Sequence, residues 1–115
     1  MVKEILEYHD IIFEANVGKN AQENWDLISN ASQNDIWFHL GSGMPSPHVI
    51  LKIPNNFSLK KIPKQVIYWC ANLCKSNSKY SDIKKVTVIY TEIKNVSKGN
   101  TIGSVYTKKT SDLKI

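Results

Sequence analysis

The sequence predicts a single-domain α+β fold, in which a mixed or mostly antiparallel sheet carries two helices on one face. Two observations lead to this prediction. Segments with β-type alternation recur along the chain, and two segments with apolar residues at helical spacing interrupt them. The order is strand, helix, two strands, helix and three strands, and 115 residues with 42% hydrophobic composition suffice for one hydrophobic core.

The first elements are a strand and a short helix. Residues 11–17 are apolar and favour β structure, and they end at a Gly18-Lys19 turn. Asn20 followed three residues later by Glu23 is typical of a helix start, and apolar residues then recur at helical spacing as far as residue 30. We expect this helix to be buried on its Trp25 side.

A hairpin with a long loop is predicted next. Residues 36–40 alternate, so that Trp37 and His39 share one side of a strand. A loop rich in glycine and proline follows, and residues 48–53 resume strand character. Whether His48 shares the face of His39 depends on a register that the sequence leaves open.

The longest predicted helix opens at Pro63 and has a broad apolar stripe that includes Cys70 and Cys74. These are the only cysteines, and their spacing fits small core residues rather than a disulfide or zinc pair. Stepping by about 100° per residue places a basic stripe with one aromatic on the opposite side. Its members are Lys64, Tyr68, Asn72, Lys75 and Lys79.

The C-terminal part is predicted to form a meander. Residues 86–93 alternate β-branched and aromatic side chains, and residues 95–100 are a polar turn. Residues 102–107 and 113–115 are expected to be further strands.

The charge is unevenly distributed. Residues 1–51 contain two lysines and seven acids, whereas residues 52–115 contain 13 lysines and three acids. Such asymmetry indicates a polyanionic partner, with a solvated lysine-rich surface as the alternative. All 15 basic residues are lysine, which suits contacts to phosphate rather than two-pronged readout of guanine.

Two kinds of chemistry receive little support. A zinc site would have to combine His39 and His48 with the two helical cysteines, which belong to another element. An enzyme could use either histidine as a general base beside Ser42, Ser46 or Asp35, but no nucleophile elbow or phosphate-binding glycine loop is present. We therefore expect a protein without catalytic activity, metal or cofactor.

The chain contains no apolar run long enough to cross a bilayer and no secretion-signal pattern at its start. We accordingly expect a soluble, cytoplasmic protein without membrane insertion.

An ordered set of short motifs resembles the NFACT-R domain, the RNA-binding domain of NFACT proteins. The resemblance covers nearly the whole chain, and its most specific part is the Asp-x-Trp-Phe-His element followed by His-Val. The main motifs are Val17-Gly18-Lys19, Asp35-Ile36-Trp37-Phe38-His39, Pro47-His48-Val49, Val88-Ile89-Tyr90-Thr91 and Lys94-x-Val96-x-Lys98. The first domain of the coiled-coil-domain-containing 25 family is similar in its Gly-Lys, Asp-Ile-Trp-Phe-His and Ile-Pro-Lys features, here Gly18-Lys19, residues 35–39 and residues 62–64.

The resemblance implies an RNA-binding module of ribosome-associated quality control, with tRNA or ribosomal RNA and the ribosome as partners. The contacts that it implies are Lys19, Trp37, His39, His48, Lys75, Lys94 and Lys98. Two positions depart from the family pattern: Lys19 stands where many members have arginine, and Ser46-Pro47 replaces a glycine and a small polar residue before His48.

The leading hypothesis is a nucleic-acid-binding domain spanning residues 1–115 that binds RNA without catalysis. The basic stripe of the long helix would supply Lys64, Tyr68 and Lys79 in addition to the contacts that the resemblance implies. DNA binding is the alternative of the same kind, and a protein-interaction module that uses the acidic first half is the alternative of another class.

Overall fold

A six-stranded antiparallel sheet forms the centre of the molecule, with strand order β1-β2-β4-β3-β5-β8. The computed structural model describes residues 1–54 and 57–115. The strands of this sheet are β1 (Val2–Tyr8), β2 (Ile11–Val17), β3 (Ile36–Leu40), β4 (Val49–Lys52), β5 (Thr87–Glu92) and β8 (Ser111–Lys114). A separate two-stranded sheet consists of β6 (Val96–Lys98) and β7 (Val105–Thr107). The predicted α+β class and antiparallel pairing are confirmed.

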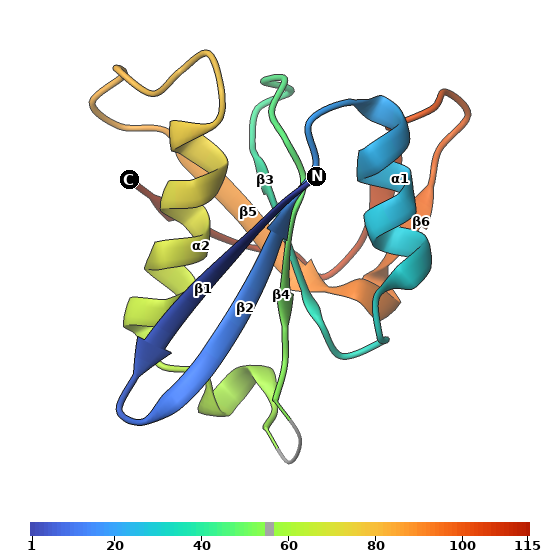
Figure 1. Ribbon diagram of the computed structural model, residues 1–115. Coiled ribbons are helices and arrows are strands. Elements are labelled where there is room, and N and C mark those ends of the chain that lie inside the picture. The colour runs from blue at the N-terminus through green and yellow to red at the C-terminus, as the bar shows by residue number, and fades with distance from the viewer. Residues whose placement is uncertain (55–56) are drawn as a thin grey trace.

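The two α-helices lie on opposite faces of the sheet, and the prediction that both share one face is wrong. Figure 1 shows α1 (Ala21–Asn30) and α2 (Lys64–Ser76) on either side of the strands. Ile36 and Phe38 of β3 belong to the core beneath α2, whereas Trp37 belongs to the core beneath α1. Both faces of the central strands are apolar, so each face needs a cover, and one helix is available for each.

The strand β1 was not predicted. Its charged residues Lys3, Glu4 and Glu7 weaken the apolar alternation, because β1 is an edge strand with one face largely open to solvent. A two-residue turn joins it to β2, with His9 and Asp10 at φ angles of 49° and 65°. Positive φ at both central residues is the geometry that two-residue hairpins favour, so the turn sets the register of the β1–β2 pair.

The two helix starts follow the predicted signals. The Oδ1 atom of Asn20 accepts a 2.9 Å hydrogen bond from the backbone N–H of Glu23, which confirms the predicted cap of α1. Pro63 immediately precedes α2, and the helix begins at Lys64. Short 3₁₀ turns, η1 (Leu59–Lys61) and η2 (Ile93–Asn95), precede α2 and β6.

The β6–β7 hairpin packs beside α1 and replaces the predicted polar turn at residues 95–100. The indole Nε1–H of Trp25 donates a 2.8 Å hydrogen bond to the backbone oxygen of Ser104, and Val96 and Val105 pack against the α1-side core. The predicted strand over residues 102–107 is shortened to β7. The tip of this hairpin therefore lies close to the start of α1.

In the part of the chain that the structure describes, no helix has the length and apolar character that a bilayer crossing needs.

Candidate functional site

The side chains of His39 and His48 lie on the same face of the sheet. Trp37 pairs with Ile50 and Phe38 with Val49, so the antiparallel register brings His48 opposite His39 at the loop end of the hairpin. The two ring centroids are 5.0 Å apart, with the rings perpendicular. This settles the register that the sequence left open.

Trp37 completes a cluster of three rings beneath this face. Its indole is stacked on the His39 ring, with centroids 5.6 Å apart, and meets the His48 ring edge-on at 5.5 Å. The Nε1–H of Trp37 donates a 3.0 Å hydrogen bond to Nδ1 of His48. The cluster therefore fixes the orientation of both imidazoles.

A cleft of about 630 Å³ opens above the two histidines, and we call it the histidine cleft. It lies where the β2–α1 loop, the β3–β4 loop, the segment after α2 and the β6–β7 hairpin converge. Of the described residues that line it, two are lysines and none is acidic. The lining residues are Val17, Gly18, Lys19, Asn20, Ala21, Asn24, His39, Pro45, Ser46, Pro47, His48, Asn77, Ser78, Lys79 and Gly103.

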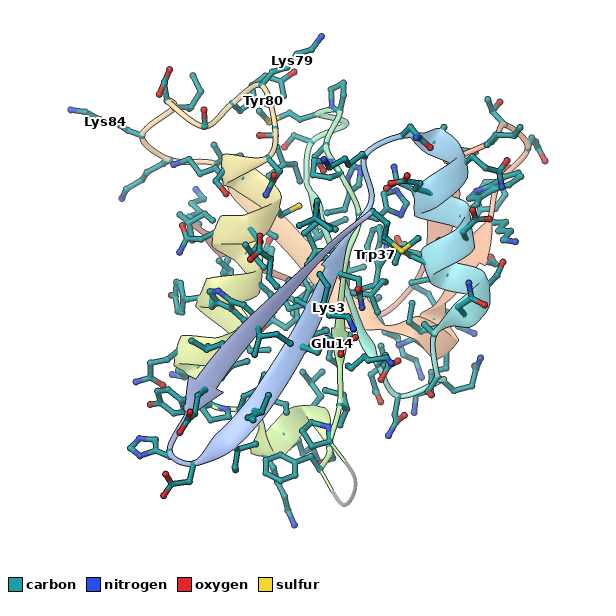
Figure 2. The ribbon with its side chains drawn as sticks, viewed as in Figure 1. Lys3, Glu14, Trp37, Lys79, Tyr80 and Lys84 are labelled. Carbon is teal, nitrogen blue, oxygen red and sulfur yellow. The ribbon has the colours of Figure 1, made fainter. Side chains whose placement is uncertain are left out.

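Lys79 and Lys19 are the two lysines that line the cleft, and they come from different loops. Figure 2 shows Lys79 on the loop after α2, with its side chain extending away from the fold. Lys19 follows β2, directly before α1. The cleft therefore combines positive charge at its rim with polar ring nitrogens at its floor.

Gly18 and Asn24 join the β2–α1 loop to His48. The backbone N–H of Gly18 donates to the carbonyl oxygen of His48 at 3.0 Å, and the backbone N–H of His48 donates to Oδ1 of Asn24 at 3.1 Å. A Cβ atom on Gly18 would lie 2.1 Å from that Oδ1. A residue with a side chain would therefore displace the asparagine that holds the histidine backbone.

Asn24 was not among the predicted site residues. It is 8% exposed on the buried side of α1, one helical turn before Ile28. A polar side chain on the apolar face of a predicted helix is the signal that could have identified it, because a buried amide needs hydrogen-bond partners.

Burial changes the protonation of both histidines. It lowers the pKa of His48 to about 3, with the neighbouring His39 adding to the shift. Burial also lowers the pKa of His39, although the hydrogen bond between its Nδ1 and the backbone oxygen of Leu40, 2.6 Å long, opposes this effect. Both imidazoles are therefore neutral at pH 7, and the charge of the cleft comes from its lysines.

Trp37 requires a correction to its expected role. Its side chain is 1% exposed, so it presents no ring face on which a base could stack. Its contacts with His39 and His48 make it a positioning residue beneath the cleft.

The predicted basic stripe holds for its members within α2, since Lys64, Tyr68, Asn72 and Lys75 share the face of the helix away from the core, but it does not include Lys79. The helix ends at Ser76, so Lys79 lies outside it and lines the cleft, whereas Lys64 lies at the other end of a helix about 18 Å long. Tyr68 is 46% exposed but does not line the cleft. The Nζ atom of Lys75 donates to the backbone oxygen of Ile115 at 3.1 Å.

Lys94 and Lys98 also lie outside the cleft. The ammonium of Lys94 is 3.6 Å from the carboxylate of Glu92. The Nζ atom of Lys98 donates to Oγ of Ser29 and lies 5.4 Å from the ring centroid of Trp25. The position of Lys98 indicates that it helps hold the β6–β7 hairpin against α1.

The candidate zinc ligands do not lie together. Cys70 and Cys74 are buried in the core beneath α2, whereas the histidines lie on the α1 face of the sheet. Burial raises the pKa of both thiols, that of Cys74 to about 12. Within residues 1–54 and 57–115, no three histidine, cysteine or acidic side chains gather in a way that could hold a metal ion.

The candidate catalytic residues do not form a nucleophile–base pair. The Oγ–H of Ser46 donates to the carbonyl oxygen of Pro47, and this Oγ accepts from the backbone N–H of Leu40. The carboxylate of Asp35 accepts from the backbone N–H groups of Ser32 and Ile53. These groups have structural partners, and a histidine with a pKa near 3 is a weak base at neutral pH.

Comparisons with known proteins show similarity over most of the chain. The model of the family described as the NFACT protein RNA binding domain matches residues 5–109. The coiled-coil domain-containing protein 25 of Mus musculus is 35% identical over 102 residues, which cover 86% of this chain and 49% of that protein. Protein JLP2 of Saccharomyces cerevisiae is 37% identical over 86 residues, covering 71% of this chain and 41% of that protein.

A solved structure shares the fold. It is the C-terminal part of the fibronectin/fibrinogen-binding protein from Streptococcus suis, which superposes with a TM-score of 0.80 at 25% identity. The match covers 98% of this chain and 44% of the other. The chain thus spans about half the length or less of the relatives that it matches.

Proposed function

Because this chain belongs to the family of the NFACT protein RNA binding domain, we propose that it binds RNA in the histidine cleft, without catalysing a reaction. The observation that carries this proposal is the composition of the cleft. Its lining combines Lys19 and Lys79 with the neutral rings of His39 and His48, and it includes no carboxylate among the described residues. A phosphate group finds two cations there, and no fixed negative charge of the lining opposes it.

The neutral histidines and the lysines have different tasks in this proposal. Lysine ammonium groups neutralise phosphates whatever the sequence of the RNA, so they supply most of the affinity. The ring nitrogens of the histidines are hydrogen-bonding groups at a fixed position, and they supply local selectivity. Their neutrality also supports binding rather than acid–base catalysis.

The loop after α2 extends the positive surface away from the cleft. Lys84 and Lys85 are exposed on this loop, and Figure 2 shows Lys84 extending into solvent. Because this loop also carries Lys79, a strand bound in the cleft would continue over further cations. We propose that these lysines contact phosphates outside the cleft.

The biological RNA is a further part of the proposal. We propose a role in ribosome-associated quality control in the cytoplasm, with tRNA or ribosomal RNA as the ligand and the ribosome as the larger partner; family membership supports the RNA-binding part of this proposal. The relatives are about twice as long as this chain. A binding experiment on this chain therefore tests the binding step alone.

The test is a binding titration with a labelled single-stranded RNA across a range of salt concentrations. We expect measurable affinity at low salt and a linear fall of log K with log salt. Lys19→Gln and Lys79→Gln should each weaken binding and reduce the magnitude of the salt slope by about 1. Lys64→Gln makes the same charge change at the far end of α2 and serves as the matched control.

Two outcomes would overturn the proposal. One is negligible affinity for RNA at low salt. The other is an equal loss of affinity in the Lys64→Gln control and in the two cleft variants, since this would mean that net charge rather than the cleft determines binding.

A further inference from the structure

The hydrogen bonds of His39 and His48 determine which ring nitrogen carries the proton in each. The indole N–H of Trp37 can only donate, so Nδ1 of His48 must accept from it and must be unprotonated. The carbonyl oxygen of Leu40 can only accept, so Nδ1 of His39 must carry a hydrogen and donate it. The two histidines are therefore held in opposite tautomers.

The neutral state of both rings completes this assignment. A neutral imidazole carries one N–H, and burial lowers the pKa of both residues. In His48 the hydrogen is on Nε2, which makes this atom a donor. In His39 the hydrogen is on Nδ1, which leaves Nε2 as an acceptor.

Both Nε2 atoms retain some contact with solvent. Neither makes a hydrogen bond to any residue that the structure describes, and no buried side-chain nitrogen or oxygen among these residues lacks a partner. The Nε2 atoms are thus not fully buried, and both residues line the histidine cleft. The ring centroids lie 5.0 Å apart, so the two imidazoles are near enough for one small polar group between them to contact both.

We propose that His48 and His39 recognise the 2′-hydroxyl group of a ribose in the cleft, with Nε2–H of His48 donating to the hydroxyl oxygen and Nε2 of His39 accepting its hydrogen. A hydroxyl both accepts and donates through one oxygen, which matches a donor and an acceptor side by side. The 2′-hydroxyl is also the group that distinguishes RNA from DNA. The inference rests on the proposed function, because it names the part of the RNA that this same cleft recognises.

The two lysines of the cleft are placed to contact phosphates when a ribose lies against the histidines. Lys19 and Lys79 line the same cleft, so the phosphates on either side of the ribose lie within the reach of long flexible side chains. Phosphate contacts alone would hold DNA and RNA equally. The histidine pair therefore accounts for selectivity between the two sugars.

Substitution by asparagine separates the structural and the recognition roles of each histidine. An asparagine amide reaches about as far as the Nδ1 position of histidine and has nothing at the Nε2 position. His48→Asn can keep an acceptor for Trp37, and His39→Asn can keep a donor for the Leu40 oxygen, while each variant loses its group in the cleft. Tyr68→Phe, on an exposed part of α2 outside the cleft, is the control.

The experiment compares the affinities for oligouridine and oligodeoxyuridine of equal length, which differ only in the 2′ position. The expected result is a preference of about tenfold for the ribose strand in the native protein, from two net hydrogen bonds. In His48→Asn and His39→Asn the preference should fall toward onefold, with affinity for the deoxyribose strand unchanged. Tyr68→Phe should keep the native preference.

The outcomes distinguish this inference from the function on which it rests. Equal, salt-dependent affinity of the native protein for both strands would overturn recognition of the hydroxyl and leave nucleic-acid binding in place. A uniform loss of affinity for both strands in folded asparagine variants would also overturn it. No binding of either strand at low salt would overturn the proposed function itself. The comparison on the native protein can still overturn the inference if the variants fail to fold.

Discussion

The indole Nε1 of Trp37 and Nδ1 of His48 lie 3.0 Å apart and share a hydrogen bond beneath the histidine cleft. Both residues are almost completely buried, at 1% and 2% exposure. A buried ring nitrogen without a hydrogen-bond partner lowers the stability of the folded state, so each of these side chains offsets the free-energy cost of burying the other. The same contact fixes the tautomer that the cleft presents.

Trp37→Phe should destabilise the protein because it removes the only described donor to this nitrogen while keeping an aromatic side chain in the core. We expect the free energy of unfolding to fall by about 1 to 3 kcal/mol, which urea denaturation would measure. Trp25→Phe is the matched control, since it breaks a similar indole hydrogen bond that is exposed, from a side chain that is only half-buried. A loss in the control that equals the loss at Trp37 would argue against the importance of burial.

Stability should depend on pH between pH 7 and 5. The pKa of His48 is about 3 in the folded state and near 6.5 in the unfolded chain. The unfolded state therefore binds more protons in this range, and stability falls as the pH falls. From His48 alone, the loss between pH 7 and 5 is about 2 kcal/mol, and His39, whose pKa burial also lowers, contributes in the same direction.

Urea denaturation of the native protein and of His48→Asn at several pH values would measure this dependence. The variant has no titrating group at position 48, so its unfolding free energy should vary less with pH in this interval. Parallel profiles for the two proteins would contradict the assignment of the dependence to His48.

The strands and helices with a clear apolar period could be predicted from the sequence, and the placement of the helices could not. Residues 36–40 show apolar side chains on both faces of β3, which is compatible with one helix on each face. Periodicity assigns residues to a face, but it does not say which helix covers that face. The strand β1 escaped prediction because charged residues occupy an edge strand that has no second neighbour.

The sequence predicted the hairpin that carries the site but not how its side chains are brought together. The tryptophan and histidine motifs indicated the hairpin, but the register, and with it the meeting of His39 and His48, depends on the geometry of the connecting loop. The helical spacing that grouped Lys64 with Lys79 was extended past the end of α2 at Ser76. Lys79 lines the cleft because of the conformation of the loop after α2, and helical periodicity does not predict the conformation of a loop.

The two cysteines should resist thiol reagents in the folded protein. Cys70 and Cys74 are both 0% exposed, and burial raises the pKa of both thiols, so little reactive thiolate is available. We expect slow reaction with dithionitrobenzoate under native conditions and rapid reaction of both thiols in denaturant. Rapid native labelling would contradict the position of these residues in the core beneath α2.

Gly18→Ala should disturb the cleft through Asn24. The added Cβ would lie 2.1 Å from Oδ1 of Asn24, the atom that accepts the backbone N–H of His48, so the amide must move and the loop must shift. We expect a loss of about 1 to 3 kcal/mol in unfolding free energy together with weaker RNA binding. Gly43→Ala is the control: φ of +72° makes alanine unfavourable there by about 1 kcal/mol, but apart from its chain neighbours no residue that the structure describes has a heavy atom within 4 Å of the added Cβ. Gly43 does not line the histidine cleft, so Gly43→Ala should lose stability and keep its RNA affinity. An equal loss of affinity in both variants would show that general destabilisation, rather than displacement of Asn24, weakens binding.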